Sequence, residues 1–288
     1  MKIYVVIPIH NRKNITRDCL LSLRRQASRD FQVIVVDDGS TDGSGDMVSG
    51  EFPEAVLLRG DGNLWWTGAV NLGVRFALEH GQPEDAVLLL NDDLIVPPDY
   101  IATLIRLAGQ HPDTLIGSAV VDSDDPDRIT WGGTVLDWNR AGINHINIGK
   151  KLSSFPADYC VEVSTHHGRG VLIPLQVYRK VGLYNERHYP QYGDIEFPVR
   201  AKKAGYKLLM CYGAVVCTHP TEPIYNPVFR YTLRSIKPYF WSTRSASDLR
   251  FRFWFAYDTS TNLLQGTRFL IYDLVHVVRN FIRDFNFS

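Results

Sequence analysis

Short apolar runs recur along the first 120 residues, and within each run apolar residues follow one another instead of alternating with polar ones. The runs lie at residues 3–7, 32–36, 55–58, 86–90 and 115–121. A strand covered by helices on both faces has this pattern, because neither of its faces meets water. The sequence therefore predicts five strands of a buried, mostly parallel sheet.

Helical spacing of apolar residues separates these runs. Residues 15–23 and 69–78 carry apolar side chains three or four positions apart, and a shorter helical pattern passes through Met47 and Val48. Repeated strand–helix–strand units predict an α/β fold with a doubly wound sheet. Further along, the pattern predicts helices at 175–181 and 196–204 and a strand at 206–217.

The last 64 residues differ in composition from the rest of the chain. Residues 225–288 carry 9 Lys and Arg against 4 Asp and Glu, and they hold 16 of the 34 aromatic residues. Such a shift indicates a boundary between two parts of a chain. We therefore expect a first domain over residues 1–224 and a basic, aromatic, mainly helical extension over residues 225–288.

The overall composition excludes several classes of protein. The 288 residues contain 31 Lys and Arg and 31 Asp and Glu, so no net charge favours nucleic acid as a partner. Cys19, Cys160, Cys211 and Cys217 contain no Cys-x-x-Cys pair. We expect them to be buried thiols in a reducing compartment. Without a signal-peptide pattern or a long apolar segment, the sequence predicts a cytoplasmic protein.

Polar clusters follow three of the predicted strands. They are Pro8-Ile9-His10-Asn11-Arg12, Asp37-Asp38-Gly39-Ser40 and Asn91-Asp92-Asp93. In an open parallel sheet, ligands bind at the carboxyl ends of the strands, so we expect these clusters to converge there. Taken alone, the second cluster is also explained by a turn followed by a helix cap.

Asn91-Asp92-Asp93 predicts a divalent metal site. Adjacent carboxylates at the end of a buried strand repel each other unless a cation or hydrogen-bond donors are present. Oxygen ligands of this kind favour Mg²⁺ or Mn²⁺, which commonly also hold a substrate phosphate. The chain has neither a P-loop nor a Gly-x-Gly-x-x-Gly turn after its first strand, which argues against a P-loop NTPase and a nicotinamide dehydrogenase.

Taken together, the segments resemble the inverting family 2 glycosyltransferases of the GT-A fold, over about residues 2–220. The resemblance rests on residues 5–12, 36–42, 62–71 (Gly-Asn-Leu-Trp-Trp-Thr-Gly-Ala-Val-Asn), 90–93 and 193–200. It implies a GT-A type Rossmann-like sandwich with a C-terminal helical extension. Residues 62–66 are similar to a branch that builds bacterial surface polysaccharides, often rhamnosyltransferases.

The resemblance also implies roles for residues in the donor site. Asp38 corresponds to the carboxylate that contacts the nucleotide base, with Pro8 and His10 in the same pocket. Asp93 corresponds to the direct metal ligand and Asp92 to a ribose or water-mediated contact, while Asn91 stands where the family has a first Asp. The remaining implied contacts are Asn63 and Trp66 to the donor, His219 to the metal and Arg244 to phosphate, although a lone His before Pro is also commonly structural.

Asp194 corresponds to the family's catalytic base. The acidic residue that commonly precedes it is Gly193 here, and Glu196 is the nearest second carboxylate, a candidate for acceptor or phosphate contact. An acceptor hydroxyl has a high pKa, so a carboxylate must take its proton as the new bond forms. The alternative is that Asp194 caps the helix that follows it.

These features predict a metal-dependent inverting glycosyltransferase that moves a sugar from a nucleotide-diphosphate donor to a glycan or lipid-linked acceptor. A sugar-nucleotide nucleotidyltransferase and a non-catalytic carbohydrate-binding relative are the alternatives. The extension is expected either to contact the cytoplasmic face of a membrane peripherally or to form a homodimer or lid.

Overall fold

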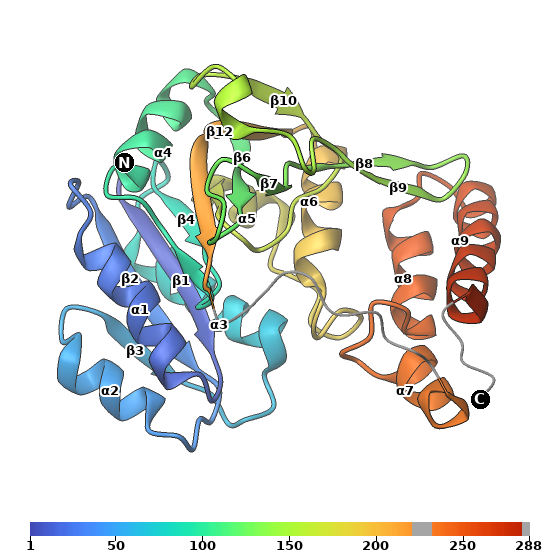
Figure 1. Ribbon diagram of the computed structural model, residues 1–288, viewed down its shortest axis with the longest axis horizontal. Coiled ribbons are helices and arrows are strands. Elements are labelled where there is room, and N and C mark those ends of the chain that lie inside the picture. Colours follow the sequence, from blue (N-terminus) through green and yellow to red (C-terminus); the bar gives the residue numbers. More distant parts are fainter. Residues whose placement is uncertain (221–231, 284–288) are drawn as a thin grey trace.

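A β-sheet forms the middle layer of the computed structural model, which describes residues 1–220 and 232–283 (Figure 1). Its strands, in spatial order, are β10 (Cys160–Glu162), β12 (Lys207–Thr218), β6 (Thr114–Val121), β11 (Val171–Pro174), β4 (Ala86–Leu89), β1 (Ile3–Ile9), β2 (Phe31–Asp37) and β3 (Val56–Arg59). Four neighbouring strands are parallel: β1 (Ile3–Ile9), β2 (Phe31–Asp37), β3 (Val56–Arg59) and β4 (Ala86–Leu89). The predicted α/β fold with a mostly parallel sheet is confirmed.

The other half of the sheet mixes strand directions. β6 (Thr114–Val121) and β12 (Lys207–Thr218) are parallel to each other, but β11 (Val171–Pro174) lies between β4 and β6 and is antiparallel to both. The short strands β5 (Leu94–Ile95), β7 (Ile129–Trp131) and β10 (Cys160–Glu162) complete it. The five predicted strands are present, but β11 was not predicted, because it has only four residues and lies in a region without clear periodicity.

Helices cover both faces of the sheet (Figure 1). One group is α1 (Lys13–Arg24), α2 (Ser44–Glu51) and α4 (Tyr100–Gln110), and the other is α3 (Trp65–His80), α5 (Leu175–Val181) and α6 (Gly193–Lys203). α3 packs closely on β1, and the absence of a side chain at Gly73 allows this, since a Cβ there would lie 2.5 Å from a methyl group of Val6. The predicted helices are therefore confirmed, with small shifts of their ends.

The C-terminal extension packs against the sheet domain through a second hydrophobic core. It consists of η2 (Leu233–Ser235), α7 (Ile236–Trp241), α8 (Leu249–Thr259) and α9 (Leu263–Arg283). Phe255 and Phe269 are buried there with Leu136 of the hairpin β8 (Thr134–Asp137) and β9 (Gly142–His145). The helical extension is thus confirmed, whereas the domain boundary at residues 224–225 lies outside the described residues and stays a prediction.

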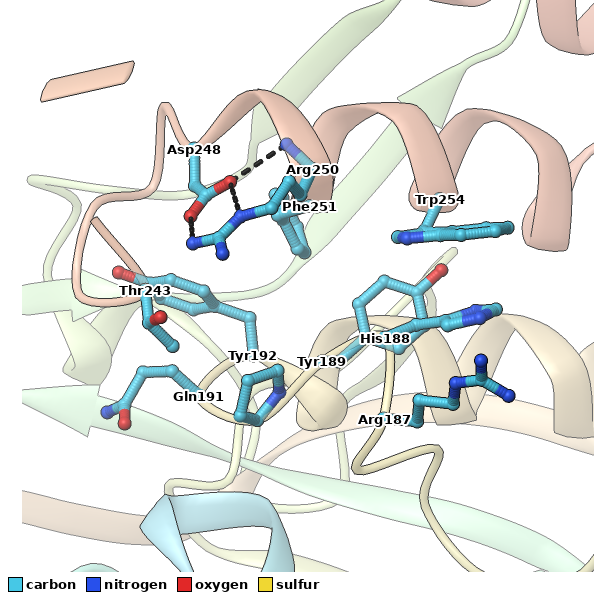
Figure 2. A pocket seen from close by; sticks show the side chains of 11 residues that line it. Arg187, His188, Tyr189, Gln191, Tyr192, Thr243, Asp248, Arg250, Phe251 and Trp254 are labelled. Atoms are coloured by element: carbon cyan, nitrogen blue, oxygen red, sulfur yellow. Dashed lines mark hydrogen bonds and ion pairs between the residues drawn. The ribbon is translucent and has the colours of Figure 1, made fainter. Parts of the chain in front are cut away.

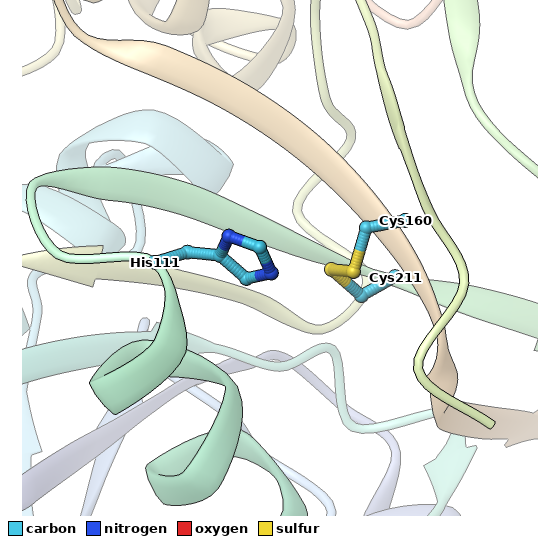
Figure 3. Close-up of side chains that lie close together, drawn as sticks. All are labelled: His111, Cys160 and Cys211. Atoms are coloured by element: carbon cyan, nitrogen blue, oxygen red, sulfur yellow. A yellow bond between two sulfur atoms is a disulfide. The ribbon is translucent and has the colours of Figure 1, made fainter.

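Two of the four cysteines are paired, which corrects the expectation of free thiols. Cys160 of β10 and Cys211 of β12 form a disulfide, and His111 lies beside it (Figure 3). The two cysteines are directly opposite each other in antiparallel strands, with their Cα atoms 4.1 Å apart. They are 51 residues apart in sequence, so only the strand register brings them together. Cys19 and Cys217 are free.

A short 3₁₀ helix, η1 (Leu152–Ser154), precedes β10. Among residues 1–220 and 232–283, every helix is too short or too polar to span a bilayer.

Candidate active site

A cavity of about 440 Å³ opens at the carboxyl ends of β1, β2 and β4. Its walls include these predicted site residues: Pro8, His10, Asp38, Trp66, Asn91, Asp92, Asp93 and Arg244. The three polar clusters therefore converge as expected, because the ends of neighbouring parallel strands lie at one edge of a sheet. Arg244 comes from the C-terminal extension, which thus closes one side of the cavity.

The two adjacent carboxylates have different environments. Asp92 is buried, with Oδ1 2.9 Å from Arg12 Nη1 and Oδ2 accepting the Thr16 hydroxyl at 3.0 Å. Burial raises the pKa of Asp92 to about 6, against the lowering influence of Arg12. Asp93 Oδ2 is 3.5 Å from Arg12, and its Oδ1 is buried without a hydrogen-bond partner in the described chain.

These environments fit a divalent cation on Asp93. An unpartnered carboxylate oxygen at a buried position is unfavourable unless a cation or donor reaches it. Both oxygens of Asp92, in contrast, already have partners. The residues present are therefore suited to hold a cation through Asp93, with Asp92 and Arg12 fixing its surroundings.

His219 approaches this cluster through its backbone. Its N–H donates to the carbonyl of Asp93 at 2.8 Å, while its ring Nε2 lies 3.1 Å from Asp18 Oδ2 of α1. The residue is 9% exposed and does not line the cavity. Its predicted metal role stays a prediction, and the contact with Asp18 is one of the interactions that position its ring.

Asp38 organises the loop that leads into α3. Its Oδ1 accepts the N–H of Gly62 at 2.8 Å and its Oδ2 accepts the N–H of Trp65 at 3.0 Å. Gly39 follows with φ of +71°, and a Cβ there would lie 2.9 Å from the Cα of Gly62. The Asp-Gly pair therefore lets this loop lie against the end of β2. Asn63 is exposed beside the cavity and is not part of its wall.

The two tryptophans at the start of α3 have different surroundings. Trp66 is half-buried, packs edge-on against Tyr184 and donates its Nε1–H to Asn91 Oδ1 at 3.1 Å. Trp65 is 40% exposed, and the guanidinium of Arg244 lies 5.8 Å from its ring centre. Both line the cavity, so an aromatic wall is available for a sugar or base.

Asp194 lies behind this wall. Its Oδ2 accepts the N–H of Gly168 at 2.8 Å, and Trp66 packs over the same glycine so closely that a Cβ there would collide with the indole ring. The residue is partly exposed, but its Oδ1 is buried without a hydrogen-bond partner in the described part of the chain. Desolvation raises its pKa to about 6. Asp194 is in the first turn of α6, whose N-cap is Tyr192, so it does not itself cap the helix.

Glu196 faces away from the cavity. It is 2% exposed, and Arg200 donates Nε to its Oε1 at 2.8 Å and Nη2 to its Oε2 at 3.2 Å. Arg200 also donates to the carbonyls of Val181 and Leu183, each at 2.8 Å. This arrangement ties α6 to the segment after α5, and it leaves Glu196 without access to a ligand in the cavity.

Residues 4–164 match the sequence profile described as glycosyl transferase family 2. The chain belongs to this family.

Several glycosyltransferases are similar to parts of this family 2 chain. One is GlyA of Streptococcus pneumoniae, 30% identical over 107 residues, which are 36% of this chain and 15% of that protein. Another is the low-salt glycan biosynthesis hexosyltransferase Agl10 of Haloferax volcanii, 26% identical over 153 residues, or 52% of this chain and 47% of that protein. The matched segments thus span less than half of either relative.

Solved structures share the fold. Residues 1–349 of S. aureus TarS superpose with a TM-score of 0.58 at 13% identity, covering 98% of this chain and 73% of that one. GalNAc-T7 superposes with a TM-score of 0.60 at 14% identity, and the match covers 76% of this chain and 44% of that one. At this level of identity the likeness establishes the GT-A fold of the family 2 chain and nothing finer.

Six residues of the cavity wall are not among the predicted site residues: Ile9, Arg12, Gly62, Trp65, Ala69 and Gln191. Ile9 and Arg12 belong to the first polar cluster, and Gly62, Trp65 and Ala69 belong to the segment 62–71 on which the family resemblance rests. The position of Arg12 in the first cluster was a usable signal, since a cation beside two carboxylates reduces their repulsion. Gln191 had no such signal.

Proposed function

We propose that this family 2 glycosyltransferase transfers a sugar from a nucleotide-diphosphate donor, with a divalent cation and with inversion, to a glycan or lipid-linked acceptor in bacterial surface polysaccharide synthesis. The observation that carries the proposal is the convergence of Asp38, Asp92 and Asp93 on one cavity beside two tryptophans. Solved structures of similar fold were determined with UDP and Mn²⁺, with UDP-GlcNAc, or with GDP-Man and Mn²⁺, and they support such a donor.

In this proposal the donor lies along the cavity. Asp38, Pro8 and His10 contact the base, and the carboxylate of Asp38 has lone pairs left for this after binding two backbone N–H groups. Asp92 contacts the ribose of the donor or a water molecule beside it. Asp93 holds the cation, and His219 is a further predicted ligand of that cation. Asn63, Asn91 and Trp66 contact the donor, while Arg244 and Arg12 provide positive charge for the phosphates.

The cation, when bound, stabilises negative charge on the departing diphosphate. The acceptor oxygen attacks the anomeric carbon from the face opposite the leaving group, and the bond to the diphosphate breaks as the new C–O bond forms. Asp194 takes the hydroxyl proton, for which its raised pKa is suitable. Asp194 is partly exposed but does not line the cavity, so the acceptor reaches it from outside that cavity or after a movement of Trp66 or the segment around Gly168.

The test is a thermal-shift panel of nucleotide sugars with and without Mn²⁺. A donor at 100 times its Kd should stabilise the protein by about 2.7 kcal/mol. The shift should be lost in Asp93→Asn and kept in Asp46→Asn, a matched change at an exposed carboxylate of α2. A shift that survives in Asp93→Asn, or none with any nucleotide sugar, would overturn the proposal. NMR of the product then reports its anomeric configuration.

A second pocket lies beside the cavity, between residues 187–192 and the start of α8 (Figure 2). Its lining includes His188 stacked on Trp254, with ring centres 3.7 Å apart, and it shares Gln191 with the donor cavity. Its volume of about 110 Å³ leaves room for little more than part of a sugar ring. We assign it no separate role.

A further inference from the structure

α9 carries an exposed apolar stripe along its whole length. Leu264, Ile271, Val275, Val278 and Ile282 are between 45% and 80% exposed. At 100° per residue they fall within about 60° of the helix circumference. The opposite face, with Phe269 and Val277 buried, is the one that packs on α8, so the stripe is additional to the internal core.

The exposed charges of α9 are all basic. Arg268, Arg279 and Arg283 are exposed, as is His276, and they lie along one side of the stripe. Asp273, the acidic residue between them, is buried with its Oδ1 2.8 Å from Arg252 Nη1. The apolar stripe is therefore bordered by positive charge. Residues 263–283 contain no exposed acidic side chain.

A cavity of about 400 Å³ adjoins the stripe on this basic side. It lies between the β8–β9 hairpin, the start of α8 and α9, and His276, Arg279, Asn280 and Arg283 line it. Asp273 also lines it, with Oδ1 paired to Arg252 and Oδ2 buried without a hydrogen-bond partner among the described residues, and three arginines against this one carboxylate leave the net charge of the lining positive. Arg279 also borders the apolar groove formed by Val275, Val278 and Ile282. A phosphate in the cavity would thus lie next to an apolar surface.

We propose that α9 binds the surface of a membrane containing anionic phospholipids, with its apolar stripe among the acyl chains and a lipid phosphate in the adjoining basic cavity. An amphipathic helix with Arg beside an apolar face lies in the membrane interface in this way. The attraction between Arg side chains and anionic lipids adds to the apolar contribution.

A second copy of the chain fits the stripe less well. Because the exposed charges of α9 are all basic, pairing two copies through this face would bring like charges together, which is unfavourable. An anionic lipid surface complements both features of the helix at once.

The position of α9 also connects this surface to the active site. α8 lies between α6 and α9, which is the outermost helix of the extension (Figure 1). The same extension carries Arg244, whose carbonyl accepts the Tyr192 hydroxyl at 2.8 Å and whose guanidinium lines the donor cavity. A membrane bound at α9 would therefore hold the cavity close to lipid-linked acceptors, a consequence that rests on the proposed function; lipid binding itself does not.

The test is flotation of the full chain with vesicles of phosphatidylcholine alone or mixed with phosphatidylglycerol. We expect binding to the mixed vesicles only, weakened by high salt. Arg268→Gln with Arg279→Gln should weaken binding about 25-fold, since each arginine contributes about fivefold. Ile271→Asp with Val275→Asp should abolish it. Ala102→Asp, at an exposed position of α4, is the matched control and should bind normally.

Circular dichroism and the donor-induced thermal shift should stay unchanged in all these variants, so loss of lipid binding can be distinguished from misfolding and from failure of the proposed function. Equal binding to both kinds of vesicle, or to neither, would overturn the proposal. So would a dimer in solution that Ile271→Asp with Val275→Asp converts to a monomer, because the stripe would then be a protein interface. Soluble glycerol phosphate that prevents flotation at millimolar concentration would indicate a free-phosphate site in place of a membrane surface.

Discussion

Arg12 and Asp92 form an ion pair at the wall of the cavity at the carboxyl ends of β1, β2 and β4, with Nη1 of Arg12 2.9 Å from Oδ1 of Asp92. The same guanidinium nitrogen is 3.5 Å from Oδ2 of Asp93. This asymmetry distinguishes two adjacent carboxylates that look equivalent in sequence. Asp92 is engaged by protein partners, whereas Asp93 keeps one buried oxygen without a hydrogen-bond partner in the described residues.

The first prediction concerns the two carboxylates. Asp93→Asn should weaken Mn²⁺ binding by more than about 100-fold, while Asp92→Asn should weaken it only about tenfold, as expected for a residue that orients the direct ligand. Electron paramagnetic resonance of free Mn²⁺ during titration measures both. EDTA should also remove activity and Mn²⁺ or Mg²⁺ restore it, and full turnover in the chelator would contradict the metal role.

The second prediction concerns proton transfer. Asp194→Asn should lower kcat by about 10² to 10⁴ and leave donor affinity nearly unchanged, because it removes the proton acceptor and not a donor contact. In the wild type, kcat/KM should rise with pH up to about 6 and then level off, since the carboxylate must be unprotonated. The carboxyl of Asp92 has a similar pKa in the wild type, so Asp92→Asn is the control, and in this variant the pH dependence of kcat/KM should persist. Loss of donor binding together with activity in Asp194→Asn would contradict the assignment.

The third prediction concerns stability. Burial raises the pKa of Asp194 from 3.8 to about 6 in the folded protein. Between these values the folded state retains a proton that the unfolded state has lost, so the stability contributed by the protonated group declines as pH rises through the window. The decline is about 2 kcal/mol once partial exposure is considered. Urea unfolding at pH 4 and pH 7 should show a loss of stability that is smaller by about this amount in Asp194→Asn than in the wild type, because Asp92, whose pKa is raised similarly, contributes to the loss in both.

The fourth prediction separates structure from substrate contact at Glu196. Glu196→Gln breaks a pair with Arg200 in which the carboxylate is buried, and should reduce the free energy of unfolding by about 2 kcal/mol. Because Glu196 does not reach the cavity, KM for donor and acceptor should stay unchanged. Glu79→Gln, in the solvent-facing last turn of α3, is a matched control that should change neither the free energy of unfolding nor KM. A higher KM for the acceptor in Glu196→Gln would instead support the acceptor contact that the sequence predicted for Glu196.

The fifth prediction concerns the disulfide. In the chain-entropy model, a bond that closes a loop of this length stabilises the folded state by about 4 kcal/mol. Cys160→Ser should therefore lower the melting temperature under oxidising conditions, and a reductant should lower that of the wild type to the same value. Cys217→Ser is the control. If reductant has no effect and peptide mapping finds both thiols free, the original expectation of unpaired cysteines stands.

The apolar runs and the polar clusters of the sequence by themselves determine much of the fold and the position of the site. Buried parallel strands require continuous apolar runs, and the connectivity of such a sheet brings Asp38, Asn91 and Asp93 to one edge, so both the fold and the position of the cavity follow from local patterns. The composition of residues 225–288 likewise predicted a helical extension.

The disulfide, the orientation of Glu196 and the exposed face of α9 were decided only by the tertiary structure, because each depends on contacts between segments far apart in the chain. The register of β10 on β12 pairs Cys160 with Cys211, and the approach of Arg200 turns Glu196 away from the cavity. The packing of α9 on α8 determines which of its apolar residues are core and which remain on the surface. A sequence specifies the periodicity of an element, but which face meets water is set by the elements that pack against it.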